Sequence, residues 1–376
     1  MHYSLIRFST IFVLAGLLFT SATIKNHPSK NNFTVIAYYA GGIKDIDQYP
    51  IEKLTHIIFS FLHLKGNKFT VDKKEDTLTI QHLVALKKRN PNLKIQLSLG
   101  GWGGCETCSQ VFSTPAARQE FAESVKAVMI YFKTDGIDLD WEYPAIEGVP
   151  GHQYLPADKD NFTDLVQRLR TTMGNKYEIS FAAGGFTTYL EQSIDWKKVM
   201  PLVDRVNLMT YDLTNGYSTT TGHHTPLYST SVQKESTDNA VKYLEALGVP
   251  KNKLVIGAAF YGRIFENAAL ENNGLNQSTK FKHGVDYKGL PEFLAKNKNF
   301  HSFWDSTAQA PYMYDATQKL FFTYDDPRSI QIKTKYALDK KLNGIMFWEL
   351  NNDVPKGGLL DAIDKTVKQY SLTKTK

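Results

Sequence analysis

Short runs of apolar and β-branched residues alternate along the chain with longer segments in which apolar residues recur at helical spacing. The short runs are typical of buried strands. The pattern predicts eight strands, at residues 34–39, 55–62, 94–99, 136–141, 178–183, 205–210, 254–260 and 344–348. The helices predicted between them include residues 80–88, 115–132, 159–173, 236–247 and 329–341. Strands and helices in this order indicate βα units around a parallel sheet.

The same alternation occurs in open doubly wound sheets and in closed barrels, and the strand ends separate the two. Nearly every predicted strand ends in aromatic, acidic or glycine residues, as in AYYAGG, SLGGW, DLDWEYP, MTYD, FYGR and FWE. Barrel enzymes place their sites at the carboxyl ends of all eight strands, whereas an open sheet concentrates polar groups at one switch point. We therefore predict an α/β fold, a (β/α)8 TIM barrel over residues 33–370.

The connection between the seventh and eighth predicted strands is unusually long. Roughly 80 residues separate FYGR from GIMFWE, where a loop and a helix need far fewer. Residues 265–310 carry Asn-rich and Lys-rich turns between short apolar runs. We predict that they form a small α+β insertion between strand 7 and strand 8, beside the site.

Residues 1–22 have the features of a secretory signal peptide. Arg7 supplies positive charge, residues 11–19 are apolar, and residues 20–22 offer a small-residue cleavage site. The apolar stretch is too short for a comfortable span, and no later segment approaches the roughly 20 apolar residues that one requires. We expect cleavage near Ala22 and a secreted protein, extracellular or periplasmic, with no membrane attachment in its mature form; an uncleaved amino-terminal anchor is the lesser alternative.

The composition is that of a folded globular protein. The chain of 376 residues is 42% hydrophobic and 12% aromatic, which argues against disorder. Its net charge of +6 is spread over many lysines without a dense basic run, so we expect an ordinary solvated surface and no nucleic-acid partner. We also expect a monomer.

The chain contains two cysteines, Cys105 and Cys108, in the segment GWGGCETC. A single CxxC cannot complete a four-ligand zinc site by itself. For an exported protein we expect a local disulfide that braces the loop; two free thiols are the next interpretation and redox catalysis is the last.

The strongest chemical signal is the segment TDGIDLDWEYP. Asp138, Asp140 and Glu142 occupy alternate positions, and apolar residues occupy the positions between them. Alternate side chains on a strand share a face and lie about 6.6 Å apart. The three carboxyl groups therefore point into the barrel, and the apolar residues pack outward against the helices.

Three acids on one low-dielectric face cannot all ionise cheaply, so at least one proton should be retained near neutral pH. Glu142, the last of the three and the nearest to the barrel mouth, is best placed to act as a general acid. The alternatives are a structural acidic stack and a Mg²⁺ or Ca²⁺ site. Such metal sites usually draw their oxygen ligands from loops or from several strands, which disfavours the second alternative.

DGIDLDWEYP resembles the DxxDxDxE signature of the family 18 glycoside hydrolases, the chitinase family. Four more segments resemble motifs of that family in the same order, namely SLGGW at 98–102, MTYD at 209–212, FYGR at 260–263 and GIMFWEL at 344–350. The long connection after FYGR falls where many members carry an insertion domain, although it is short here. The resemblance covers nearly the whole chain after the signal.

The resemblance implies that the protein hydrolyses chitin or chito-oligosaccharides, which are β-1,4-linked N-acetylglucosamine polymers, by a retaining mechanism assisted by the substrate. In this scheme Glu142 protonates the glycosidic oxygen, and the substrate's own 2-acetamido carbonyl attacks the anomeric carbon to form an oxazolinium ion. Asp140, tuned by Asp138, hydrogen-bonds the acetamido N–H, and the Tyr211 hydroxyl positions the carbonyl. Glu142 then activates the water. No cofactor and no metal are implied.

The resemblance also implies a cleft lined at the strand ends. The substrate-binding positions are Tyr38, Phe61, Gly101, Trp102, Tyr143, Met209, Asp212, Tyr261, Arg263 and Trp348. Trp348 is implied to form the floor on which the reacting sugar stacks. For a single aromatic residue core packing would be the better interpretation, but placement at strand ends favours the cleft. Gly101 serves either a close backbone approach or a tight turn.

The roles expected of Asp212 and Asp135 differ from that of Glu142. Asp212 is the only obvious acid that could oppose Glu142 across the substrate, as an inverting enzyme requires. The resemblance instead implies that Asp212 hydrogen-bonds the substrate. Asp135 is expected to brace the entrance of the strand and to have no catalytic duty.

Three other functions fit the same sequence features. A non-catalytic chitin-binding lectin arises on this fold when the final Glu of the signature is replaced, and here Glu142 is present. An endo-β-N-acetylglucosaminidase would share the acids but shape the aromatic cleft differently. A metal-dependent hydrolase would lose its activity with a chelator.

Overall fold

The computed structural model describes residues 33–374 of the chain. The secretory signal predicted at residues 1–22 lies outside the described residues. Among the helices of residues 33–374, none combines the length and the apolar character that a membrane crossing requires.

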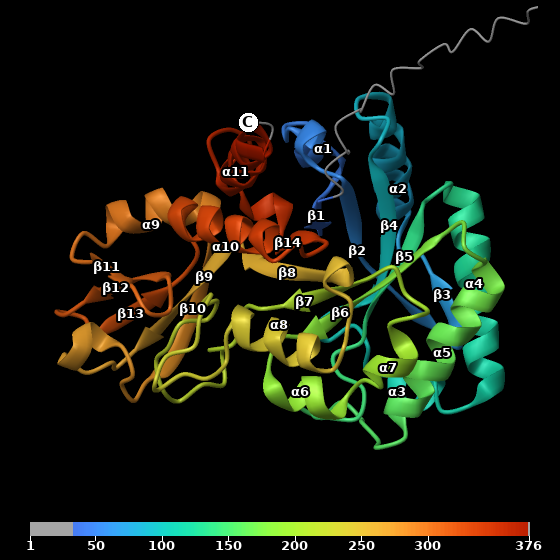
Figure 1. Cartoon of the computed structure of the whole chain (residues 1–376), viewed down its shortest axis with the longest axis horizontal. Helices are drawn as coiled ribbons and strands as arrows, with labels where there is room; N and C mark the ends of the chain where they lie inside the picture. The colour runs from blue at the N-terminus through green and yellow to red at the C-terminus, as the bar shows by residue number, and fades with distance from the viewer. Residues whose placement is uncertain (1–32, 375–376) are drawn as a thin grey trace, which may run out of the picture. The chain divides into compact units, whose positions relative to one another are not determined.

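Within the described residues, eight parallel strands close into a barrel, which confirms the predicted (β/α)8 fold (Figure 1). The strands are β1 (Thr34–Tyr39), β2 (His56–Lys65), β4 (Lys94–Gly100), β5 (Gly136–Asp140), β6 (Glu178–Gly184), β7 (Arg205–Met209), β8 (Leu254–Ala259) and β14 (Gly344–Trp348). Their order around the barrel is β1-β14-β8-β7-β6-β5-β4-β2, and a parallel pairing of β1 with β2 closes the ring. The short strand β3 (Lys68–Thr70) forms a hairpin with the extended end of β2.

Alternation along the strands divides the core of the barrel into two layers. On β5, Ile137 and Leu139 face outward, together with Trp141, and pack in the large cluster between the strands and the helices. A smaller cluster that includes Tyr38 and Met346 fills the barrel interior. A strand with period two sends successive side chains into different layers, and this places the acids of β5 inside the barrel.

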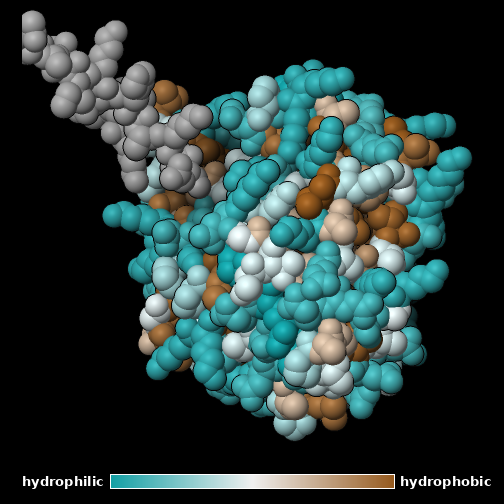
Figure 2. All heavy atoms as spheres, turned by 90° about the vertical axis from the view of Figure 1, so that its right-hand side faces the viewer, coloured by the Kyte–Doolittle hydropathy of each residue, from teal (hydrophilic) through white to brown (hydrophobic). Residues whose placement is uncertain are grey.

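The helices cover the outside of the barrel. They are α1 (Ile43–Ile46), α2 (Lys74–Ala85), α3 (Cys108–Val111), α4 (Pro115–Phe132), α5 (Asp158–Met173), α6 (Thr187–Gln192), α7 (Trp196–Val199), α8 (Thr237–Ala246), α10 (Pro327–Asp339) and α11 (Leu359–Lys374). Side-chain caps start three of the longer ones, with Thr114 before α4, Ser236 before α8 and Asp326 before α10. On the side of α4, Figure 2 shows a mainly hydrophilic surface with small separate apolar patches, as expected of amphipathic helices that turn their polar face to solvent.

The helix predicted at residues 80–88 is longer than expected. Helix α2 begins at Lys74, and a 3-10 turn, Leu86–Lys88, follows its end. The buried residues of the helix are Thr79, Ile80 and Leu83, all beyond its first turn. The first turn, with the sequence KEDT, contains no apolar residue and therefore shows no apolar repeat. An apolar period therefore detects the packed half of this helix only.

Between β8 and β14 the chain forms a second, antiparallel sheet, drawn in orange beside the barrel in Figure 1. Its strands are β9 (Tyr261–Glu266), β10 (Lys280–Asp286), β11 (His301–Asp305), β12 (Ala310–Asp315) and β13 (Leu320–Thr323), with the helix α9 (Leu290–Lys296). The sheet order is β10-β9-β13-β12-β11. Residues 265–310 lie within this longer stretch. Since Phe260 alone separates β8 from β9, the sheet starts directly at the barrel mouth.

Candidate active site

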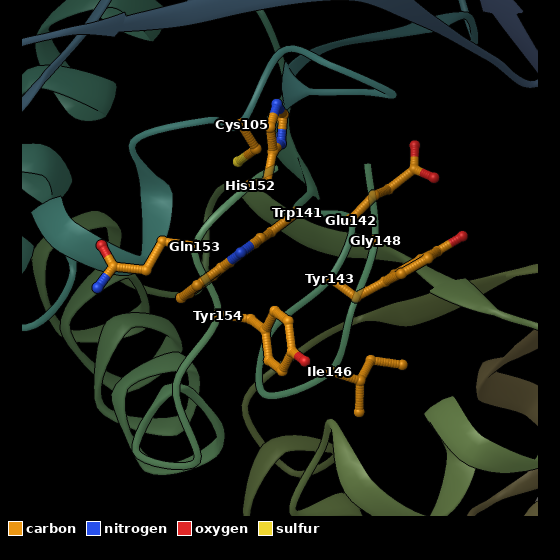
Figure 3. Close-up of a pocket in the computed structure, with 9 residues that line it drawn as sticks. All are labelled: Cys105, Trp141, Glu142, Tyr143, Ile146, Gly148, His152, Gln153 and Tyr154. Atoms are coloured by element: carbon orange, nitrogen blue, oxygen red, sulfur yellow. The ribbon is translucent and has the colours of Figure 1, made fainter. Parts of the chain in front are cut away.

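The acids of β5 lie at the carboxyl end of the barrel. Asp138 is fully buried and Asp140 nearly so, while Glu142, just past the end of the strand, is half-buried. Figure 3 shows Glu142 and Tyr143 pointing to one side of the chain and Trp141 to the other. The exposure of the three acids thus increases along the chain, from the barrel interior to its mouth.

Asp138 is held by side chains from four other strands. Its Oδ2 accepts hydrogen bonds from the Tyr38 hydroxyl at 3.0 Å and from Ser98 Oγ at 3.2 Å. Its Oδ1 accepts from Ser180 Oγ at 2.6 Å and from Asn207 Nδ2 at 3.0 Å. Both carboxylate oxygens are therefore engaged by protein donors, which fixes the carboxylate and leaves it poorly suited to bind a metal ion.

Burial raises the pKa of all three acids. For Asp140 the pKa lies well above its ordinary value, because burial is reinforced by the charges of Glu142 and Asp138. For Glu142 burial is likewise the main cause, and the charge of Asp212 raises its pKa further. Asp140 Oδ1 is buried and has no hydrogen-bond partner among the described residues. The pair therefore retains a proton near neutral pH and offers an unused acceptor.

The pKa of Asp212 is shifted in the opposite direction to the pKa values of these acids. Burial would raise its pKa, but contacts with His224 and Arg263 hold that pKa well below the usual range for aspartate. Arg263 binds both carboxylate oxygens, and His224 Nδ1 lies 3.6 Å from Oδ1. Asp212 is thus a paired carboxylate at neutral pH, poorly suited to donate a proton.

Aromatic rings cover the floor of the site. The Phe61 ring stacks on the Trp348 ring, with centroids 5.4 Å apart and an interplanar angle of 13°. The Tyr38 ring lies 5.9 Å from Trp348, beneath the surface, where 1% of the residue is exposed. Gly101 makes room for this floor, because a Cβ on it would lie 2.3 Å from a ring carbon of Phe61.

The walls of the site carry the remaining predicted residues. The Tyr211 and Tyr261 rings meet edge to face at 6.3 Å, and Met209 lies in the same interior cluster as Tyr211. On another wall, the Trp102 ring lies 6.3 Å from the Tyr143 ring. The structure therefore gathers all the predicted site residues at one end of the barrel, with Tyr38 and Asp138 beneath the surface.

The loop after β4 contains a disulfide bond between Cys105 and Cys108, which confirms the expected loop-bracing bond. Cys105 lines a pocket together with Trp141 and Glu142 (Figure 3). The disulfide therefore lies close behind the candidate acid.

Sequence reasoning missed several side chains that contact these acids. Asn207 donates to both Asp138 and the Tyr38 hydroxyl. It stands two residues before Met209 on β7, and this alternation could have identified it. His224, beside Asp212, lies in a loop where no periodic signal exists.

No group of three or more His, Cys, Asp or Glu side chains within residues 33–374 could hold a metal ion. The arrangement can instead donate a proton from Glu142 and accept a substrate donor on Asp140. Aromatic faces at the floor and walls suit the C–H faces of sugar rings.

Comparisons with known proteins agree on one family. The sequence model of the glycosyl hydrolases family 18 matches residues 34–353. Chitinase A1 of Niallia circulans is 34% identical over 340 residues, which cover 80% of this chain and 48% of that protein. The chain thus spans about half the length of this curated relative.

Solved structures with the same fold include a family 18 N-acetylglucosaminidase from Paenibacillus barengoltzii, at 34% identity and a TM-score of 0.81. The match covers 89% of this chain and 99% of that one. The Group IV chitinase of Ostrinia furnacalis in complex with allosamidin superposes with a TM-score of 0.82 at 25% identity, over 90% of this chain and 99% of that one.

Proposed function

This chain belongs to glycosyl hydrolase family 18, and on that premise we propose that it is a chitinase that hydrolyses β-1,4-linked N-acetylglucosamine polymers. The observation that carries the proposal is the pair formed by Asp140 and Glu142. Both are acids with raised pKa values, and Asp140 keeps a buried oxygen without a protein partner. A substrate that brings one N–H donor to Asp140 and one basic oxygen to Glu142 would satisfy both groups.

The proposed mechanism uses Glu142 twice. As an acid it protonates the glycosidic oxygen, while the 2-acetamido carbonyl of the substrate attacks the anomeric carbon and the leaving sugar departs. As a carboxylate it then takes a proton from the water that opens the oxazolinium ion, so that the configuration is retained. Asp140 accepts a hydrogen bond from the acetamido N–H, and its negative charge stabilises the ion.

Other residues orient the substrate in this proposal. Tyr211 contacts the acetamido carbonyl, and Trp348, stacked on Phe61, supports the reacting sugar. Asp212 acts as a hydrogen-bonding residue, since its pairing with Arg263 supports a role other than that of a second acid. Export of the enzyme is also part of the proposal, and the disulfide supports it because such bonds persist in oxidising compartments.

The test is hydrolysis of chitin tetrasaccharide by wild type, Glu142→Gln and Glu147→Gln, with product lengths and anomers resolved. Glu147 lies five residues beyond Glu142 and is exposed, so it is a matched control. We expect wild type and Glu147→Gln to release β-anomers first. Glu142→Gln should bind the substrate but cleave it about 10²- to 10⁴-fold more slowly, the usual contribution of a general acid.

Other outcomes lead to other functions. Binding without cleavage by wild type would indicate a lectin, and neither binding nor cleavage would direct attention to N-glycan substrates. Release of single sugars only would favour an N-acetylglucosaminidase, the activity named for the Paenibacillus barengoltzii protein. Release of α-anomers first would contradict the retaining mechanism.

A further inference from the structure

Trp102 projects from the loop after β4, and it is 52% exposed. Its ring lies 6.3 Å from the ring of the half-buried Tyr143 and 6.4 Å from the ring of the exposed Tyr217. A ring on a mobile backbone contributes less to binding affinity, because fixing that backbone when the ligand binds costs conformational entropy.

The backbone that carries Trp102 is intrinsically permissive. Gly100, Gly101 and Gly103 adopt φ values of +101°, +77° and +85°, which L side chains rarely adopt. The loop is anchored where it begins, because the Gly101 N–H donates to the Asp140 carbonyl at 2.9 Å. It then turns back on itself, since the Gly104 N–H donates to the Gly101 carbonyl at 2.8 Å.

The other end of the loop is anchored through the disulfide. Cys108 is fully buried at the start of α3, and the next residue, Ser109, donates to both oxygens of the buried Asp158 at 2.9 Å. The sulfur bridge ties Cys105 to this anchored position across two exposed residues. The disulfide is the covalent link in this return of the loop to the barrel, and a hydrogen bond from the Cys108 N–H to the Cys105 carbonyl at 3.1 Å accompanies it.

We propose that the Cys105–Cys108 disulfide is a positioning element for substrate binding, which acts by holding the glycine-rich loop so that Trp102 stands fixed at the cleft. The proposal rests on the proposed function, because it assigns Trp102 to sugar binding. The cysteines themselves touch no substrate. Their contribution falls on binding, whereas the proton transfer belongs to Glu142, which follows β5, a strand paired with β4 and β6.

The test is a double-mutant cycle on chitin tetrasaccharide that compares wild type, Cys105→Ala/Cys108→Ala, Trp102→Ala and the triple variant. Removing the disulfide should raise KM about threefold to tenfold and leave kcat within about twofold, because the bond acts on binding and not on proton transfer. In the Trp102→Ala background the same removal should leave KM within about 1.5-fold, because the bond has then lost the ring on which it acts.

A control separates positioning from loss of stability. Val125→Ala removes buried volume from α4 without touching the loop, so it should lower the melting temperature and leave KM unchanged. If the alanine pair fails to fold, Cys105→Ala/Cys108→Val restores apolar volume at the more buried position. Failure of both pairs to fold would show that the fold itself requires the bond, and this would overturn the proposal.

Two further results would overturn it while leaving the proposed function intact. One is an additive cycle, in which removal of the disulfide raises KM equally with and without Trp102. The other is an unchanged KM in Trp102→Ala. In either case wild type would still cleave the tetrasaccharide, whereas failure of the proposed function would appear as no cleavage by wild type.

Discussion

Arg263 binds the carboxylate of Asp212 with both arms of its guanidinium group, at 2.5 Å from Nε to Oδ1 and 2.6 Å from Nη2 to Oδ2. Arg263 belongs to β9 of the second sheet, and Asp212 follows β7 of the barrel. Asp212 also has a left-handed backbone, with φ of 56°, which is costly for a residue other than glycine. The ion pair therefore joins the inserted sheet to the barrel at the site.

Replacing Arg263 should lower activity through Asp212. Lysine keeps the charge but cannot bind both oxygens, so we expect Arg263→Lys to reduce kcat/KM on chitin tetrasaccharide about tenfold. Alanine leaves a partly buried carboxylate unpaired, and we expect a loss of about a hundredfold. Steady-state kinetics measure both. Arg89→Lys, at an exposed pair with Glu52, is the control, and equal activity of all three variants would contradict the assigned coupling.

The charge of Asp212 should also set the alkaline limit of activity. Glu142 acts as an acid only while protonated, so kcat/KM falls as the pH rises through its pKa. Because Asp212 raises the pKa of Glu142, Asp212→Asn should move the alkaline limb to lower pH by roughly 0.5 to 1 unit.

The measurement is the pH profile of kcat/KM for wild type and Asp212→Asn, with the exposed Asp160→Asn as control. The variant also frees Arg263, so its maximal rate will fall. The position of the limb is independent of that loss. A limb that stays in place, or moves to higher pH, would separate Asp212 from the ionisation of Glu142.

The strand that carries the acids could be predicted from the sequence, because the alternation of acidic and apolar residues indicates both the strand and the side on which its acids lie. Alternation of acids with apolar residues on β5 predicts which side faces the barrel interior, and the structure has Ile137 and Leu139 in the outer layer. Asp135 was likewise expected to brace the strand entrance, and its Oδ2 accepts the Ile95 N–H at 2.7 Å.

The partners of these acids were less predictable, because they depend on the register between strands. Ser180 reaches Asp138 because β5 and β6 pair those two residues directly. A single sequence carries no signal for that register. His224 is harder still, since the loop between β7 and α8 brings it beside Asp212, and the packing of the second sheet supports it through Thr323.

A buried histidine at the opposite end of the barrel should make stability depend on pH. Burial, helped by the charge of Arg205, lowers the pKa of His56 to about 4, despite its contact with Glu178. An unfolded histidine binds its proton near pH 6.5. Between these values the unfolded state holds one more proton than the folded state, so stability falls as the pH falls through this window.

His56→Gln should remove this term. Between pH 7 and pH 5 wild type should lose about 2 kcal/mol of unfolding free energy more than the variant does, because the folded-state pKa of about 4 lies below the unfolded value. Urea unfolding at the two pH values measures the difference. The exposed His283→Gln is the control. Equal losses in wild type and His56→Gln would show that His56 does not remain neutral in the folded state.

The ammonium group of Lys333 should contribute far more to stability than that of its neighbour Lys335, although both lie on α10. Lys333 is fully buried, and its Nζ binds the two oxygens of Asp325 at 2.8 and 2.7 Å and Thr225 Oγ1 at 2.6 Å. Asp325 in turn accepts the Ala259 N–H at the end of β8. Removing the lysine therefore leaves a buried carboxylate uncompensated beside a barrel strand.

We expect Lys333→Ala to lower the unfolding free energy by about 3–5 kcal/mol, the usual result of breaking a buried ion pair from one side. Lys333→Met keeps the apolar stem and should lose nearly as much if the charge is the cause. Lys335→Ala removes only an exposed pair with Asp339 and should cost at most about 0.5 kcal/mol. Urea unfolding of the three variants decides the matter. A small loss in Lys333→Met with a large loss in Lys333→Ala would assign the stabilisation to packing of the stem, and so contradict the role given to the charge.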